Sequence, residues 1–272
     1  MRVEISVLGT LNASVGDESF APSASKPRQL LAMLALNAGK VVTVPALMEE
    51  IWGVMLPRSS ATTLHTYIAS LRRRMDQVLI GTARSAKDVL VTEHTGYRLE
   101  ADPADVDATR YGHLSSVGRR AVEAGDWATA VSSLRLALDL WRGPALSDVA
   151  TGSQLTIEVL RLEENRLSDL DLLIEAELCI GRHRYILGEL AVLCTQHPML
   201  ENFHAHYMLA LYRSGHQCRA LEVFRRLRAT MMGELGVNPS PRIRHLHQAI
   251  LSGDPRLDDP DPSDGRMISA LA

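Results

Sequence analysis

The chain has 272 residues, of which 46% are hydrophobic, and carries 29 Lys and Arg against 32 Asp and Glu. This length is sufficient for two ordinary domains with their own cores. The net charge of −3 excludes a polycation that binds nucleic acid indiscriminately. Positive charge is nevertheless concentrated at Arg72, Arg73 and Arg74, and a local concentration of this kind steers a polyanion.

The composition also limits the cellular compartment and the cofactors. Cys179, Cys194 and Cys218 are too few and too scattered for a disulfide framework or a zinc site, so we expect small, buried side chains. Glu4 interrupts the apolar run at the N-terminus, which predicts a strand and not a signal peptide. No apolar run approaches the length of a membrane span. We therefore expect a cytoplasmic protein without a metal or cofactor.

The first elements are two short strands and two helices. Val3, Ile5 and Val7 alternate with polar residues, and a turn at 15–17 leads to a second strand at 19–21. A serine cap and a proline predict a helix start at 25–27, and Asn-Ala-Gly at 37–39 ends that helix. A second helix covers 46–51.

Two basic residues stand at the start of the first helix. Lys26 and Arg28 follow its cap, where the open backbone amides can also hold a phosphate. Both side chains are therefore candidates for holding a phosphate, and the elements that follow indicate that this phosphate belongs to DNA.

The third helix, 60–75, has two unlike sides. Leu64, Ile68, Leu71 and Met75 are spaced four, three and four apart, so they form one apolar stripe. The opposite side is rich in hydroxyls and free of acids. It carries Thr62, Thr66, Ala69, Ser70 and Arg73, with Thr63, Tyr67, Arg72 and Arg74 on its flanks. Such a side can enter a DNA major groove, where short side chains reach base edges and guanidinium groups reach phosphates. A solvated amphipathic helix with a basic end is equally compatible with this segment alone.

A predicted hairpin decides between these alternatives. Strand-like runs at 89–92 and 97–99 flank Glu-His-Thr-Gly at 93–96. Three helices followed by a hairpin is the winged-helix plan, in which the third helix enters the major groove and the wing lies along the backbone or minor groove. We therefore add His94, Thr95, Tyr97 and Arg98 to the predicted DNA-binding residues.

After a polar joint at 102–105 the pattern becomes entirely helical. Gly125, Gly181 and Gly215 each separate two helical patterns, and the last two are 34 residues apart, which is the tetratricopeptide period. The helices that precede these glycines are predicted at 108–124, 155–180 and 201–214. Residues 105–251 are therefore predicted to form an all-α helical-repeat domain. The acidic, proline-rich segment 252–272 is predicted to be a disordered tail.

The sequence offers no catalytic constellation. It lacks a phosphate-binding glycine loop, a Gly-x-Ser-x-Gly elbow and a His-Glu-x-x-His motif. His204 and His206 are two positions apart and diverge on a helix, which disfavours a metal site. Several acids share one side of the 155–180 helix, and we expect that side to be solvated. They are Asp169, Asp171, Glu175 and Glu177. We predict that the protein is not an enzyme.

The motifs in this order resemble a known family. Residues 26–39, 47–53, 62–74 and 95–99 resemble the DNA-binding domain of the Streptomyces antibiotic regulatory protein (SARP) family, which are pathway-specific activators with an OmpR-type winged helix. Trp127 and the stretches 141–146 and 235–240 resemble the family's bacterial transcriptional activation domain. The implied fold is mainly α with a small β component: a winged helix at 1–104 followed by a tetratricopeptide-like domain at 105–251.

The resemblance also implies a function. It implies an activator of a secondary-metabolite gene cluster that binds direct repeats in double-stranded DNA, about one helical turn apart, as a dimer. Such a protein recruits RNA polymerase through its σ and α subunits and is associated with the nucleoid. Two alternatives stay open. The chain is otherwise a helical-repeat adaptor for a partner protein, or a repressor with the same DNA-binding fold.

Overall fold

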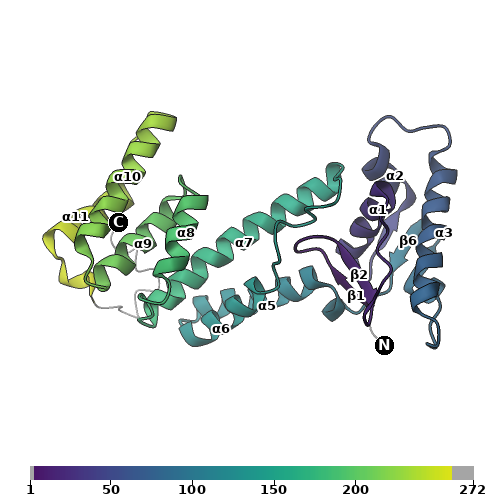
Figure 1. The fold of residues 1–272 in the computed structure, drawn as a ribbon, viewed down its shortest axis with the longest axis horizontal. Helices are drawn as coiled ribbons and strands as arrows, with labels where there is room; N and C mark the ends of the chain where they lie inside the picture. The colour runs from purple at the N-terminus through teal and green to yellow at the C-terminus, as the bar shows by residue number, and fades with distance from the viewer. Residues whose placement is uncertain (1–2, 259–272) are drawn as a thin grey trace. The chain divides into compact units, whose positions relative to one another are not determined.

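The computed structural model describes residues 3–258. They are mainly helical with two small sheets, as predicted (Figure 1). The chain divides into two compact units. The first unit comprises Met1–Leu114 and Leu136–Leu167, and the second comprises Ser115–Arg135 and Ser168–Ala272. A segment distant in sequence, 136–167, therefore folds together with the N-terminal hundred residues.

The N-terminal sheet has three antiparallel strands in the order β1-β2-β3: β1 (Val3–Ser6), β2 (Asn12–Val15) and β3 (Glu18–Ser19). Ile5 pairs with Ala13, and both side chains are buried. Two strands were predicted here and β2 was not, because Val15 is the only β-branched or aromatic residue of Asn-Ala-Ser-Val and was assigned to the turn at 15–17.

The winged helix follows in chain order. Its elements are α1 (Ser25–Leu36), β4 (Val41–Thr43), α2 (Val44–Trp52), α3 (Ser60–Val78), α4 (Ala86–Val89), β5 (Leu90–Glu93) and β6 (Gly96–Leu99). The second sheet has the order β4-β6-β5, and β5 and β6 form the predicted hairpin. Gly96 is required there, because a Cβ at this position would lie 2.0 Å from the carbonyl oxygen of Val42. Both α1 and α2 pack against α3.

A buried carboxylate joins the winged helix to the 136–167 segment within the first unit. Glu50 of α2 is 2% exposed and accepts hydrogen bonds from the backbone N–H of Gly152, Gln154 and Leu155 at 2.6, 2.9 and 3.2 Å. These amides begin α7 (Ser153–Cys179), so Glu50 caps that helix. The Gln29 amide donates to the same carboxylate at 3.1 Å.

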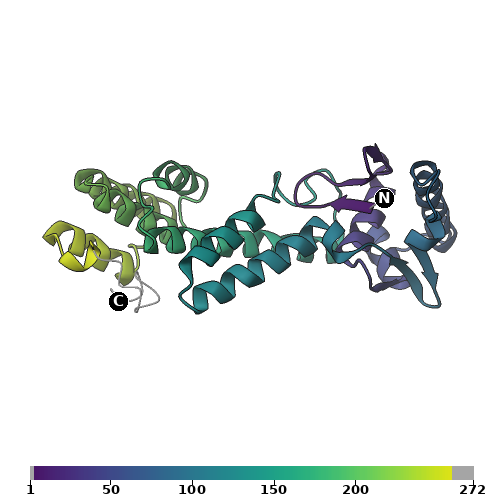
Figure 2. The ribbon, with the colours of Figure 1, turned by 90° about the horizontal axis from the view of Figure 1, so that it is seen from below.

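The second unit is entirely helical among its described residues. It contains the C-terminal parts of α5 (Asp107–Glu123) and α7, most of α6 (Trp127–Leu138), and α8 (Leu187–Gln196), α9 (Glu201–Arg213), α10 (Gln217–Leu235) and α11 (Pro241–Ser252). The antiparallel pair α9 and α10 can be followed in Figures 1 and 2. Gly125, Gly181 and Gly215 have φ angles of 71°, 76° and 80°. The three glycines therefore form the left-handed turns expected between paired helices.

Two acids of the predicted solvated side of α7 are in fact buried. Asp169 is 0% exposed and pairs with Arg119 at 2.7 Å, and Glu177 is 4% exposed and pairs with Arg135 at 2.8 Å. The expectation of a solvated side was wrong for these two residues. The repeat places a neighbouring helix over that side of α7, and each carboxylate is buried with an arginine partner.

Two further expectations had mixed outcomes. Cys179 and Cys194 are half-buried, and burial raises the pKa of the Cys194 thiol to about 12, whereas Cys218 is exposed and does not fit the expectation of a buried side chain. In the predicted tail, a short 3-10 turn at Pro255–Leu257 places Leu257 in a buried position. The rest of that tail, 259–272, lies outside the described residues.

Candidate nucleic-acid interface

Helix α3 is anchored by its apolar stripe. Leu64, Ile68, Leu71 and Met75 are between 0 and 2% exposed, as the spacing predicts. The packing of these four side chains against the rest of the winged helix fixes which side of α3 faces outward.

The outward side of α3 is open. Thr62, Thr66 and Arg73 are exposed, and Ser70 and Arg74 are half-buried. Arg73 makes no hydrogen bond or ion pair with any other described residue, so its guanidinium is available to a ligand. No acid occurs in α3 before Asp76. From Thr62 to Arg74 the predicted hydroxyl-rich side is therefore accessible and carries no negative charge of its own.

Two of the three threonine hydroxyls of α3 are already engaged with backbone carbonyls one turn earlier. The Thr66 hydroxyl donates to the carbonyl oxygen of Thr62 at 3.0 Å, and the Thr63 hydroxyl donates to that of Ser59 at 2.9 Å. A hydroxyl has one proton to donate. In this rotamer each side chain therefore offers a ligand its methyl group and an acceptor lone pair, but no donor.

Lys26 and Tyr67 meet at one aromatic ring. Lys26 Nζ lies 5.3 Å from the ring centroid of Trp52, and the ring of Tyr67 stacks on Trp52 with centroids 6.2 Å apart. Lys26 is exposed, so it is held in place and still accessible. Tyr67 instead contributes to packing between α2 and α3.

Arg72 connects α3 to the hairpin. Its Nε and Nη2 donate to the carbonyl oxygen of Leu90 at 3.1 and 2.6 Å, and Nη2 also donates to the Thr92 hydroxyl at 2.7 Å. Arg72 was predicted to contact DNA. Its surroundings favour a structural role, because its guanidinium donors already satisfy a strand carbonyl.

Arg28 is also engaged inside the first unit. Its guanidinium donates to the carbonyl oxygens of Pro22 and Leu11 at 2.9 Å each and forms an ion pair with Asp148. Its side chain is only 15% exposed. The prediction that Arg28 holds a phosphate is therefore not supported by its geometry, because binding would require it to leave three acceptors.

The wing divides into an open tip and an occupied stem. His94 and Thr95 are exposed at the turn between β5 and β6. Tyr97 is buried, with 6% exposure, and Arg98 forms ion pairs with Glu93 and Glu100. The geometry disfavours the last two predicted contacts, because alternation along β6 turns Tyr97 into the core and acids on both sides neutralise Arg98.

Two family models match the chain, one over the winged helix and one over the helices that follow it. The model described as "Transcriptional regulatory protein, C terminal" matches residues 21–99, and "Bacterial transcriptional activator domain" matches residues 106–251. The regulatory protein DnrI of Streptomyces peucetius is 47% identical, with 96% of each chain covered. The chain belongs to the SARP family.

Other relatives share the same architecture. The transcriptional regulator RedD of Streptomyces coelicolor is 34% identical to this SARP-family chain over 98% of its length and 78% of RedD. A solved structure of Mycobacterium tuberculosis EmbR, in complex with a low-affinity phosphopeptide, has a TM-score of 0.86 and 29% identity. The match covers 99% of this chain and 69% of EmbR. These relatives are transcriptional regulators.

The structure adds one residue to the candidate interface of this SARP-family chain. His65 is exposed on α3, directly before Thr66. At 100° per residue it lies nearer the centre of the outward side than Tyr67 does. Its helical angle places it on the flank of the outward side, but the hydroxyl and arginine pattern that marked this side does not include an imidazole. None of the helices in the described range 3–258 combines the length and apolarity needed to cross a bilayer.

Proposed function

We propose that this SARP-family protein activates transcription of a secondary-metabolite gene cluster by inserting α3 into the major groove of promoter DNA. The observation that carries the proposal is the outward side of α3, which from Thr62 to Arg74 is free of acids and contains Arg73, an exposed arginine without a partner among residues 3–258. Relatives such as DnrI and RedD are named as regulatory proteins, which supports the same role.

The proposed contacts divide by chemistry. Thr62, Thr66 and Ser70 face base edges, and the two threonines present methyl groups that suit the methyl of thymine. Arg73 reads a guanine or binds a phosphate, and Lys26 holds a phosphate beside the groove. Arg74, His94 and Thr95 complete the backbone contacts from the end of α3 and the tip of the wing.

Assembly on DNA is part of the same proposal. Two copies bind tandem direct repeats about one helical turn apart, so that both face the same side of the duplex. The bound pair then recruits RNA polymerase through its σ and α subunits. The family relation supports this arrangement, and no ligand beyond DNA and the polymerase is needed for it.

A gel shift with the upstream region of the protein's own gene cluster tests DNA binding. Arg73→Ala is expected to weaken binding by about 1–3 kcal/mol and to relax specificity at one base if Arg73 reads guanine. Arg120→Ala is the matched control, because Arg120 is an exposed arginine of α5 that lies outside the winged helix. Equal binding by the wild type and both variants would remove Arg73 from the interface.

Transcription with purified RNA polymerase tests the sign of regulation. Adding the protein to a cognate promoter is expected to increase transcript. A decrease would identify a repressor with the same DNA-binding surface. Absence of any shift at low salt, where phosphate contacts are strongest, would favour the adaptor hypothesis.

A further inference from the structure

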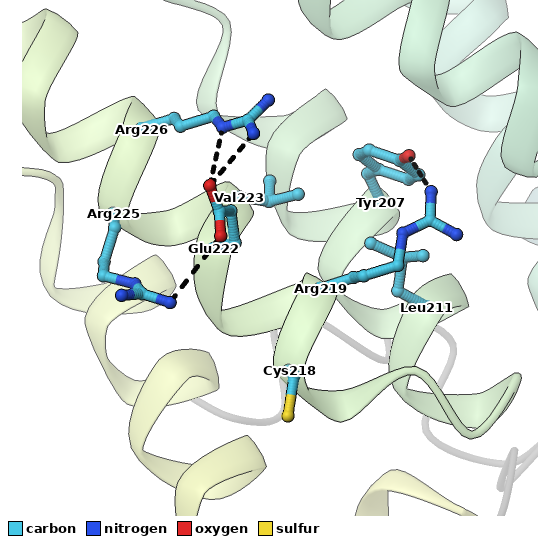
Figure 3. A pocket seen from close by; sticks show the side chains of 8 residues that line it. All are labelled: Tyr207, Leu211, Cys218, Arg219, Glu222, Val223, Arg225 and Arg226. Carbon is cyan, nitrogen blue, oxygen red and sulfur yellow. Dashed lines mark hydrogen bonds and ion pairs between the residues drawn. The ribbon is translucent and has the colours of Figure 1, made fainter.

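The second unit carries a groove that the DNA-binding proposal does not use. A cavity of about 360 Å³ lies along α9 and α10, and residues of both helices line it (Figure 3). A second cavity of about 280 Å³ shares Tyr207, Val223 and Arg226 with the first. The two cavities adjoin the same three side chains, and we call them together the α9–α10 groove.

The α9–α10 groove is positively charged. Arg219, Arg225 and Arg226 line the larger cavity together with a single carboxylate, Glu222. Glu222 is shared, at 2.9 Å from Arg226 and 3.8 Å from Arg225. Arg219 donates one hydrogen bond, of 3.4 Å, to the Tyr207 hydroxyl. A guanidinium has five N–H donors, so most of the N–H groups of Arg219, Arg225 and Arg226 are not bound by Glu222 or Tyr207.

The groove also has an apolar floor. Leu211 and Leu227 are buried at 0 and 1% exposure and line its two cavities. His204, which is 7% exposed, lines the smaller cavity, and its ring nitrogens make no well-formed hydrogen bond among the described residues. Burial lowers the pKa of His204, so the ring is neutral and offers one donor and one acceptor.

We propose that the α9–α10 groove binds an acidic segment of a partner protein. Carboxylates of the segment pair with Arg219 and Arg226, and an apolar side chain enters the groove beside Val223. Arg226 is 77% exposed, so it can turn towards a ligand at little cost. The groove contains more arginines than carboxylates, although the whole chain has a net charge of −3. This local positive charge is complementary to an acidic partner.

The same geometry disfavours nucleic acid as the occupant. Glu222 lies between Arg225 and Arg226 in the groove and would face a phosphate backbone with a like charge. The apolar floor suits a peptide side chain. Tyr207 is the single Phe, Tyr or Trp among the residues that line the two cavities, and one ring is no platform for successive bases to stack on. The proposal is independent of DNA binding by α3, so the two can fail separately.

Fluorescence anisotropy of the full chain tests the groove. The probe is a short fluorescein-labelled peptide in which glutamates flank leucines, and the control peptide carries glutamine in place of glutamate. Arg219→Gln with Arg226→Gln is expected to weaken binding of the glutamate peptide about ten-fold. The matched pair Arg120→Gln with Arg184→Gln removes the same charge from exposed positions outside the groove and is expected to leave binding unchanged.

A second variant tests the apolar floor without removing an arginine. Val223→Asp places a carboxylate beside the floor and is expected to abolish binding while promoter DNA is still shifted. Three results would overturn the proposal: absence of binding at low salt, equal binding of both peptides, or equal loss in the groove and control pairs. Displacement of the peptide by duplex DNA in the Arg73→Ala background would instead identify the groove as a nucleic-acid surface and would likewise overturn it.

Discussion

Replacing Glu50 tests whether the winged helix and the start of α7 are held together by one carboxylate. Glu50→Ala removes the acceptor for three backbone amides, of which that of Gly152 is bound at 2.6 Å. Each buried amide left without a partner costs about 1–3 kcal/mol, and the helix N-terminus loses a favourable charge worth about 0.3–1 kcal/mol. Because water reaches part of the site, we expect a total loss of about 3–5 kcal/mol.

Two measurements detect this loss of stability. Urea unfolding, monitored by tryptophan fluorescence, is expected to give a lower midpoint for the first unit, which contains Trp52 and Trp141. Hydrogen exchange is expected to show lost protection at the amides of 152–155. The adjacent Glu49→Ala is the matched control, since Glu49 is exposed and has no such role. Equal midpoints and equal protection for the Glu50 and Glu49 variants would refute the capping role.

Three further changes give distinct outcomes. Arg72→Ala is expected to loosen the hairpin and to lower stability by about 1–3 kcal/mol, since strand β5 loses a charged donor; unchanged hydrogen exchange in β5 would contradict this role. Gly96→Ala is expected to disrupt the pairing of β4 with β6, because its Cβ would lie 2.0 Å from the Val42 carbonyl oxygen; a variant that unfolds at the wild-type urea concentration would disprove that close approach. Burial raises the pKa of Asp171. Hydrogen bonds, above all the one with His206, lower it by more, so the pKa of Asp171 lies below the ordinary value of 3.8. The ionised carboxylate therefore contributes stability above about pH 4, and this contribution is lost as the pH falls through the lowered pKa. Asp171→Asn is expected to reduce the fall in urea midpoint between pH 7 and pH 3, and an identical fall in both proteins would show that Asp171 does not contribute to it.

The candidate interface combines two kinds of arginine that look alike in the sequence. Arg72, Arg73 and Arg74 are consecutive, yet Arg72 binds a strand carbonyl while Arg73 has no partner among the described residues. Successive residues on a helix point about 100° apart, so one arginine faces the hairpin and the next faces outward. Binding and folding therefore depend on neighbouring residues of the same type, and a triple substitution would not separate the two effects.

Two buried carboxylates of the repeat domain could not be recognised from the polar pattern of α7. Asp169 and Glu177 read as part of a solvated side, because aspartate and glutamate are seldom fully buried. In the folded chain each has an arginine from an earlier helix, at 2.7 and 2.8 Å. Those arginines are 50 and 42 residues away in the chain, so no local pattern connects the pairs.

The sequence by itself determined the local elements. Spacing of four, three and four placed Leu64, Ile68, Leu71 and Met75 on the buried side of α3, and all four are buried. The turn glycines were equally readable, because a left-handed backbone excludes most other residues. Both features depend on residues within a few positions of each other, which is the range over which helical periodicity and turn chemistry operate.

Only the tertiary structure decided which basic residues remain available to a ligand. Arg28 is engaged by Asp148, 120 residues later, and Glu50 caps a helix that begins about a hundred residues after it. Such pairs form when distant segments pack, and each partner is an ordinary charged residue with no signal in its own neighbourhood. The hydroxyl-rich side of α3 was therefore predictable from spacing, whereas the separation of its arginines into structural and accessible ones required the folded chain.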